Sequence, residues 1–328
     1  MHKLSNKKRL FIFILLGVAI YFLSGAVDEL RVYQGATVAV YVVGIASIIL
    51  LTGYSGQVSL GQGALLGVGG YASALMRIHF DLPIWMCFAV AILAAAIAGA
   101  LLGLAAARLS GPYLAGTTLA FAVGLPSVAN QFELLGGEQG LLFDVGFPPL
   151  SFGEDFTQYK WFFWIASLAT LIAIFWLQNV MRSRYGRSWK AVRGNDVAAE
   201  LAGINLTRNK TLAFTLSAGL AGLSGALLAM TIGTVSPSAF PLALSFSLLT
   251  GAVLSGVTTL GGVMIGAVTL VAIPDIAGAV TSRFGSSEAV TSNLPGLLVS
   301  ALLILTVLFV PNGPVEQLRA RREHRVNK

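Results

Sequence analysis

Long apolar segments separated by short polar connections occupy almost the whole chain. A membrane-spanning helix needs about 20 mostly apolar residues, and ten segments approach that length. They lie at 10–27, 34–51, 57–76, 84–107, 112–130, 161–181, 211–230, 244–260, 261–280 and 294–310. The pattern predicts an all-α, polytopic transmembrane bundle of about ten spans in a single domain, 1–328. Glycines interrupt 57–76, and 244–260 directly adjoins 261–280, so half-helices or a re-entrant element are alternatives at these places.

The composition supports a membrane protein. Apolar residues make up 56% of the 328 residues and charged residues only 11%, whereas soluble domains carry about 25% charged residues. So few charges cannot cover a water-exposed surface, which excludes a soluble enzyme and a disordered chain. Cys87 is the single cysteine, so an internal disulfide scaffold is excluded as well.

The distribution of positive charge predicts the orientation. With the N-terminus in the cytoplasm, 17 of the 21 Lys and Arg residues fall on the cytoplasmic side of ten spans, as the positive-inside rule requires. Both termini are therefore expected in the cytoplasm, and the first segment is expected to be an uncleaved helix. The net charge of +7 follows from membrane orientation and does not indicate nucleic acid. The exceptions are Arg31, Arg77, Lys160 and Arg283.

The predicted spans contain almost no groups for chemistry. Asp275 is their one ionisable residue, which argues against proton coupling. Backbone carbonyls at helix breaks leave sodium coupling open. The phosphate-binding pattern G-x-x-x-x-G-K-[ST] is absent, and the three histidines are far apart in sequence. We expect no catalytic residue, no metal site and no cofactor in this chain, so any driving energy must come from another polypeptide.

The third segment is too polar and too rich in glycine to face lipid. Gly63 and Gly67 would let a neighbouring helix approach closely, so we expect this helix inside the bundle. Its polar side chains either line a hydrated path or form hydrogen bonds between helices. The same two interpretations apply to two threonines of the fifth segment. The candidate path residues are Gln57, Ser59, Gln62, Thr117 and Thr118.

The connection 182–210 is the longest on the cytoplasmic side and has a net charge of +5. It contains a short helix, for which Asn195 or Asp196 is the N-cap and Gly203 the residue after the C-cap. Such a helix is marginal alone. It either lies on the membrane surface against anionic lipid or docks into a cytoplasmic motor. On the other side, the acidic connection 131–160 is either a solvated loop or a docking surface for an external partner.

Three stretches together resemble the permease subunits of bacterial ABC importers for branched-chain amino acids, the LivM type. They are GYSGQVSLGQGALLGVGGYASALM (53–76), RLSGPYLAGTTLAFAVG (108–124) and SRYGRSWKAVRGNDVAAELAGINLTRNKTLAFTLSAGLAGLSGAL (183–227). Three departures are visible. The family usually has His at the position of Gln62, and its external G-G-x-D/N-G-L pattern is matched only approximately by residues 136–141. The run SGVTTLGGVMIG (255–266) is degenerate compared with the family's run of paired glycines.

The resemblance implies a heteromeric importer in the bacterial inner (plasma) membrane. A second related permease subunit would pair with this chain, two ABC ATPases would hold ATP and Mg, and an external solute-binding protein would deliver the amino acid. The connection 182–210 would be the ATPase-coupling loop, with Asp196 and Glu200 facing the ATPase. The residues that the resemblance assigns to coupling are Arg187, Arg193, Asp196, Glu200 and Gly203.

Other functions remain open at this stage. A permease of the same architecture could carry urea, short amides or simple sugars. A sodium-coupled secondary carrier would act without an ATPase, and a structural membrane scaffold would carry no solute. Under every alternative, membrane lipid surrounds the chain.

Overall fold

The computed structural model describes residues 6–109, 111–146, 148, 156–256, 260–284 and 288–309, and these residues are mostly helical. The long helices are α1 (Asn6–Ala26), α2 (Glu29–Ile48), α3 (Gln62–Phe80), α4 (Ile84–Ala106), α5 (Pro112–Gln131), α6 (Gln158–Arg182), α9 (Leu206–Ile232), α10 (Leu242–Ser255), α11 (Val263–Phe284) and α12 (Glu288–Phe309). The shorter elements are the π-helix η1 (Ile49–Tyr54), the 3-10 helices η2 (Glu133–Leu135), η4 (Pro237–Ala239) and η5 (Leu260–Gly262), α7 (Arg184–Gly194), α8 (Asp196–Leu201), β1 (Leu141–Leu142) and β2 (Thr234–Val235).

Each of the ten apolar segments of the sequence overlaps one long helix, which confirms an all-α, polytopic bundle. Within the described residues, six helical stretches are long and apolar enough to cross a membrane. They are Glu29–Tyr54, Ile84–Ala106, Gln158–Arg182, Leu206–Ile232, Pro237–Ser255 and Leu260–Thr281. The molecule is therefore a multi-pass membrane protein.

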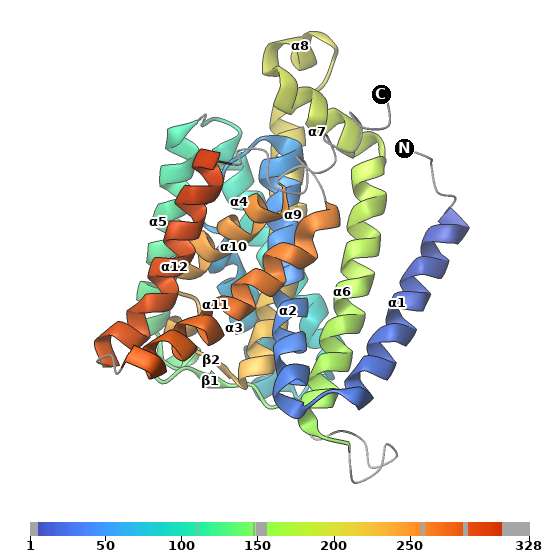
Figure 1. Cartoon of the computed structure of the whole chain (residues 1–328). Helices are drawn as coiled ribbons and strands as arrows, with labels where there is room; N and C mark the ends of the chain where they lie inside the picture. Colours follow the sequence, from blue (N-terminus) through green and yellow to red (C-terminus); the bar gives the residue numbers. More distant parts are fainter. Residues whose placement is uncertain are drawn as a thin grey trace.

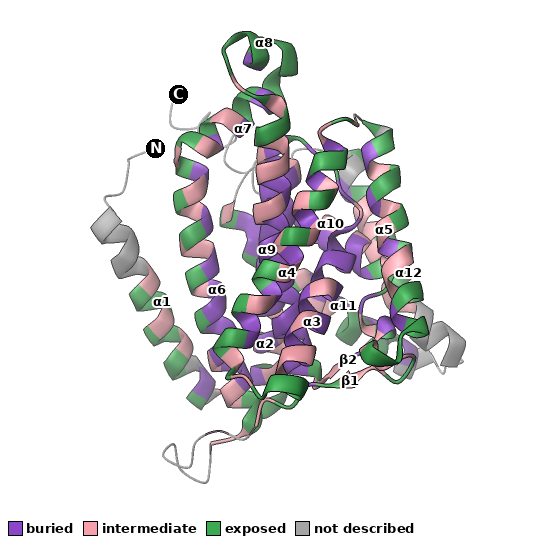
Figure 2. Ribbon diagram, turned by 180° about the vertical axis from the view of Figure 1, so that it is seen from behind, coloured by how far each residue is buried: buried purple, intermediate pink, exposed green. Residues whose placement is uncertain are grey.

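Helix α9 is at the centre of the bundle and packs most extensively on α4, α3 and α2 (Figures 1 and 2). Small residues make this packing possible. A methyl group at Gly225 of α9 would overlap the backbone carbonyl of Leu66 in α3, so the two helix backbones are in direct contact. Next to it, the Ser224 hydroxyl donates a hydrogen bond to the Val40 carbonyl of α2 at 2.8 Å. Close backbone approach and interhelical hydrogen bonds hold helices together in lipid.

The two ends of the bundle differ. Helices α7 and α8 form one end, toward which α1 begins and α12 finishes (Figure 1). At the opposite end, β1 pairs with β2 in an antiparallel ladder, with Leu141 opposite Val235 and Leu142 opposite Thr234. Two connections far apart in sequence are thereby joined, one between α5 and α6 and the other between α9 and α10.

Three expectations about elements were wrong. Helix α3 begins at Gln62 rather than at residue 57, because the backbone leaves the helical region at Gly56, whose φ is +74°. Helix α10 ends at Ser255 rather than at residue 260, where Gly256 has a φ of +80°. The sequence analysis also missed α7 in the loop 182–210.

Candidate functional site

A non-helical linker, 56–61, connects η1 to α3 and is held by side chains from several elements. The backbone amide of Gln57 donates to the Leu51 carbonyl at 3.2 Å, and the Thr52 hydroxyl donates to the backbone carbonyl of Gln57 at 3.1 Å. Further along, the Leu60 amide donates to Thr118 Oγ1 of α5 at 3.0 Å. Non-helical backbone inside a membrane bundle needs such partners, because lipid offers none.

The polar side chains of the linker and of the first turn of α3 are buried. Gln57, Ser59 and Gln62 are 5%, 3% and 0% exposed. The amide nitrogen of Gln62 donates to Ser47 Oγ of α2 at 2.8 Å and to Ser217 Oγ of α9 at 2.9 Å. The structure therefore favours the interhelical interpretation for Gln62. The Oε1 atoms of Gln57 and Gln62 have no hydrogen-bond partner among the described residues.

The two candidate threonines of α5 lie on different faces. Thr118 is 1% exposed and accepts the hydrogen bond from the linker. Thr117 is exposed, and its hydroxyl bonds only to the Tyr113 carbonyl of its own helix at 2.9 Å. The structure thus brings Thr118 to the linker and leaves Thr117 outside.

The short helix α8 has the caps that the sequence predicts. The Asn195 side chain accepts a hydrogen bond from the Ala198 amide at 3.0 Å, which makes Asn195 the N-cap. At the other end Gly203 has a φ of +82°. Its amide bonds to the Glu200 carbonyl and the Ile204 amide to the Ala199 carbonyl. This pair of bonds is the Schellman arrangement, which requires a left-handed residue at this position.

Two hydrogen bonds connect this loop to the linker region, and one ion pair lies within the loop. A guanidinium nitrogen of Arg193 donates to the Gly53 carbonyl. The side-chain nitrogen of Gln57 donates to the backbone carbonyl of Lys210 at 3.3 Å. Within the loop, the Lys210 ammonium forms an ion pair with Asp196 at 2.6 Å. The Asp196 carboxylate, which the sequence analysis assigned to an ATPase contact, is thus paired within the chain. Arg187 bonds to the Arg182 carbonyl at 3.3 Å instead, away from the linker.

One cavity of about 790 Å³ joins the candidate path to the candidate coupling loop. It is bounded by the linker, by the junction of α7 and α8, and by the turn between α4 and α5. Gln57, Arg193 and Asp196 all line it. Ser59, Gln62, Thr117, Thr118, Arg187, Glu200 and Gly203 do not line it.

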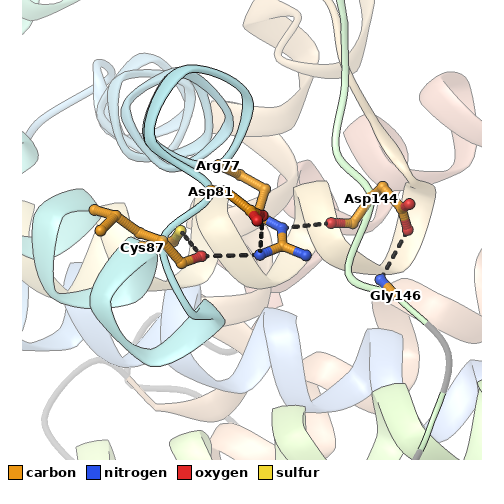
Figure 3. Close-up of polar contacts among 6 residues, drawn as sticks. Arg77, Asp81, Cys87, Asp144 and Gly146 are labelled. Atoms are coloured by element: carbon orange, nitrogen blue, oxygen red, sulfur yellow. Dashed lines mark hydrogen bonds and ion pairs between the residues drawn. The ribbon is translucent and has the colours of Figure 1, made fainter.

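The opposite end is anchored by Arg77, one of the four positive residues that do not follow the charge rule. Its guanidinium forms an ion pair with Asp81 at 2.9 Å and donates to the Leu82 carbonyl at 3.1 Å (Figure 3). It also donates to the Asp144 carbonyl at 3.0 Å. Arg77 therefore fastens the connection after α5 to the turn between α3 and α4, which gives this charge a structural role.

The intramembrane carboxylate has a neutral partner. Gln34 of α2 donates to Asp275 of α11 at 2.8 Å.

Within the part of the chain that the structure describes, no group of three His, Cys, Asp or Glu residues could hold a metal ion.

Comparison with known proteins decides the family. The family model described as "Branched-chain amino acid transport system / permease component" matches residues 31–308, which is most of the chain. The chain belongs to this family. Its members are transport permease components, so the fold and the buried polar linker region described above are those of a permease component.

Three relatives place the chain within the permease family. The permease protein LivM of Salmonella typhimurium is 29% identical over 339 residues, covering 95% of this chain and 76% of the relative. LivH of Escherichia coli is 27% identical over 299 residues, covering 85% of this chain and 91% of LivH. The ribose import permease RbsC of Haemophilus influenzae is 24% identical over 247 residues, covering 70% of this chain and 68% of RbsC. The search of solved structures found no match.

Some contacts of the candidate site in this permease component were missed from sequence. Ser47 and Ser217 have no local signal that identifies them as partners of Gln62, since they lie 15 and 155 residues away. Helix α7, in contrast, has a capping residue in the sequence that could have predicted its start. Ser183 caps its first turn by accepting from the Tyr185 amide at 3.2 Å, and Trp189 is fully buried one turn later.

Proposed function

We propose that this chain is the membrane permease subunit of an ABC importer and forms the translocation path for branched-chain amino acids delivered by an external binding protein. It would cross the inner membrane about ten times, with both termini and the α8 end in the cytoplasm. Family membership over residues 31–308 and the likeness to LivM support the class. The basic loop at the α8 end supports the orientation.

We further propose that a second permease of the same fold pairs with this chain. LivM and LivH are both similar to it over most of its length, which supports a pair of like subunits. Two ATPases would bind at the α8 end and hold ATP and Mg, so this chain would perform no covalent chemistry. The loop 182–210 would be the ATPase-coupling segment of a single permease domain.

The observation that carries the mechanism is the shared cavity lined by Gln57, Arg193 and Asp196. In the proposed cycle, the ATPases move α8 when ATP binds. Arg193 passes this displacement to the end of η1 through the Gly53 carbonyl, and Lys210 passes it to Gln57. The linker then shifts against Thr118 and opens the path along α5.

The proposed path is uncharged. Gln57, Ser59 and Thr118 offer only amide and hydroxyl groups. Such groups can bind the ammonium and carboxylate of an amino acid without coupling its movement to a proton. In this cycle Gln62 holds the helix bundle together while the linker moves.

The test is transport by the reconstituted complex. The chain, its partner permease, the ATPases and the binding protein are placed in proteoliposomes with radiolabelled leucine. Uptake that needs ATP and the binding protein is expected. Uptake by the chain alone, driven by a Na⁺ gradient, would contradict the proposal and support a secondary carrier.

One other substrate class has specific support. The relative RbsC is by name a ribose permease, so competition by unlabelled ribose is the second arm, and urea is the third. Inhibition of leucine uptake by isoleucine and valine but not by ribose or urea is expected. Strong inhibition by ribose would assign the chain to sugars.

A further inference from the structure

A second cavity, of about 420 Å³, is present at the α8 end and shares no residue with the first. It lies between the first turns of α7 and α9. Its walls include Arg184, Tyr185, Ser188, Asn205, Arg208 and Leu212. The six residues just named have no role in the transport cycle proposed above, whereas Gly203, the residue after the C-cap of α8, also lines the cavity and connects it to the coupling helix.

The cavity is strongly positive. Arg184 and Arg208 approach it from two different helices, and both side chains are exposed. Neither takes part in an ion pair within the described residues, where the pairs are Arg77 with Asp81 and Lys210 with Asp196. The Arg184 guanidinium donates to the Tyr185 hydroxyl at 3.0 Å and lowers the pKa of Tyr185, and the charge of Arg208 lowers it further.

Backbone donors add to this positive character. Ser183 caps α7 through the Tyr185 amide, and Asn205 caps α9 through the Arg208 amide at 2.9 Å. The other amides of each first turn have no acceptor within their helix. Helix N-termini favour anions, and phosphate groups in particular.

The position of the cavity suits a lipid headgroup. Arg184 follows the last residue of α6 by two positions, and the first residues of α9 line the same cavity, so two helices that are long and apolar enough to cross a membrane have their ends at the cavity. Leu212, about one and a half turns into α9, adds an apolar residue to the wall. Helix α7 itself is amphipathic, with Trp189 and Val192 buried and Arg187 exposed.

We propose that this cavity binds the phosphodiester group of an anionic phospholipid from the cytoplasmic leaflet. The placement in that leaflet rests on the orientation given under the proposed function. The two guanidinium groups grip the phosphate oxygens, for which their planar fork is suited, and the lipid chains run down beside Leu212. A bound lipid joins the start of α7 to the start of α9 and so braces the base of α8.

Binding is measured on the purified full chain, independently of transport. Native mass spectrometry and thermal unfolding are recorded with short-chain phosphatidylglycerol, with phosphatidylcholine of the same chain length, and with inorganic phosphate. Phosphatidylglycerol is expected to remain bound and to raise the unfolding midpoint, whereas the other two probes are not. The variant carrying both Arg184→Gln and Arg208→Gln is expected to bind phosphatidylglycerol about tenfold to a hundredfold more weakly, since charged hydrogen bonds are lost.

A control variant that removes one positive charge outside the cavity separates the site from general attraction to the membrane, and it is compared per charge with the double variant. Arg108 is exposed and lies in the turn between α4 and α5, outside both cavities. Arg108→Gln is expected to weaken binding about fivefold or less, the effect of one surface charge. Arg208→Lys keeps the charge without the fork and is the second test if the double variant does not fold. It is expected to bind severalfold more weakly than the wild type.

Several results would overturn the proposal. Equal protection by inorganic phosphate would show a free-anion site. Equal binding of phosphatidylcholine, or unchanged binding by the double variant and by Arg208→Lys, would show that the cavity does not select the headgroup. If the double variant binds lipid as the wild type does but no longer assembles with the ATPases, the cavity is a protein-docking surface and not a lipid site. Lipid binding is measured on the purified chain and leucine uptake on the reconstituted complex. A failure of the lipid proposal can therefore be distinguished from a failure of the proposed function.

Discussion

The Leu60 amide and the Thr118 hydroxyl are joined by a hydrogen bond of 3.0 Å between residues 58 positions apart. Leu60 belongs to a stretch without helical hydrogen bonds, and Thr118 belongs to a regular helix. This bond is therefore a direct attachment of the linker 56–61 to α5. It gives a defined route by which a displacement at the α8 end reaches the proposed path.

Replacement of Thr118 by valine tests this attachment. Thr118→Val keeps the shape of the side chain and leaves the Leu60 amide without its acceptor, so we expect a loss of about 1–3 kcal/mol in unfolding free energy. Thr117→Val is the matched control, because the Thr117 hydroxyl bonds only within α5. It is expected to change stability by about 0.5 kcal/mol or less. Denaturant unfolding of the purified chain measures both, and equal effects would contradict the role of Thr118.

Replacement of Arg193 by glutamine tests the transmission of motion. The variant loses the bond to the Gly53 carbonyl, and a charged hydrogen bond of this kind contributes enough that uptake is expected to fall about tenfold or more. ATP hydrolysis by the complex is expected to continue. The ratio of leucine imported to ATP hydrolysed is the measurement, with Arg108→Gln as the control for charge. A proportional loss of both activities would show that Arg193 acts on assembly instead.

Replacement of Gly203 by valine tests the end of α8. A β-branched residue at a φ of +82° costs about 1–3 kcal/mol, and a helix of six residues cannot absorb that cost. We expect uptake to be uncoupled from ATP hydrolysis. Gly203→Asn, which tolerates the left-handed conformation better, should retain most of the coupling. Normal uptake by the valine variant would place the coupling contact elsewhere.

Replacement of Gly225 by alanine tests the central packing. The added methyl group collides with the Leu66 backbone, which cannot move aside as a side chain would, so we expect a loss of about 1–3 kcal/mol. At Gly124 of α5 an added methyl group meets no atom within 4 Å. Gly124→Ala should therefore stabilise the isolated chain by about 0.5–1 kcal/mol, since alanine is the better helix former. Thermal unfolding of the isolated subunit should give opposite signs for the two variants.

The spans and the α8 caps could be predicted because their causes are local. Apolar length determines where a helix can cross a bilayer, so each predicted segment overlaps a helix. Asn195 and Gly203 cap α8 through residues within a few positions of themselves. The close backbone approach expected at Gly63 is found against Ser245 of α10, whereas at Gly67 the neighbouring atoms belong to the side chains of Leu125 and Phe240.

The linker and its partners could not be predicted, because their causes are distant in sequence. Part of the support for the non-helical linker 56–61 comes from Thr118, which accepts the Leu60 amide from another helix. The bond from Arg193 to Gly53 spans 140 positions. Similarly, nothing near Asp196 indicates that Lys210 neutralises it. The linker was therefore predicted as part of a helix, which its glycines alone did not exclude.

The two-residue ladder between β1 and β2 has a consequence for how the end of the bundle opposite α8 can vary. Gly140 lies against the carbonyl of Val235 so closely that any side chain there would collide with it, and the Phe143 amide extends the pairing to the Gly233 carbonyl. Insertions or deletions near either strand would break the register of the other. Changes in loop length at this end of the bundle are therefore restricted to stretches away from both strands.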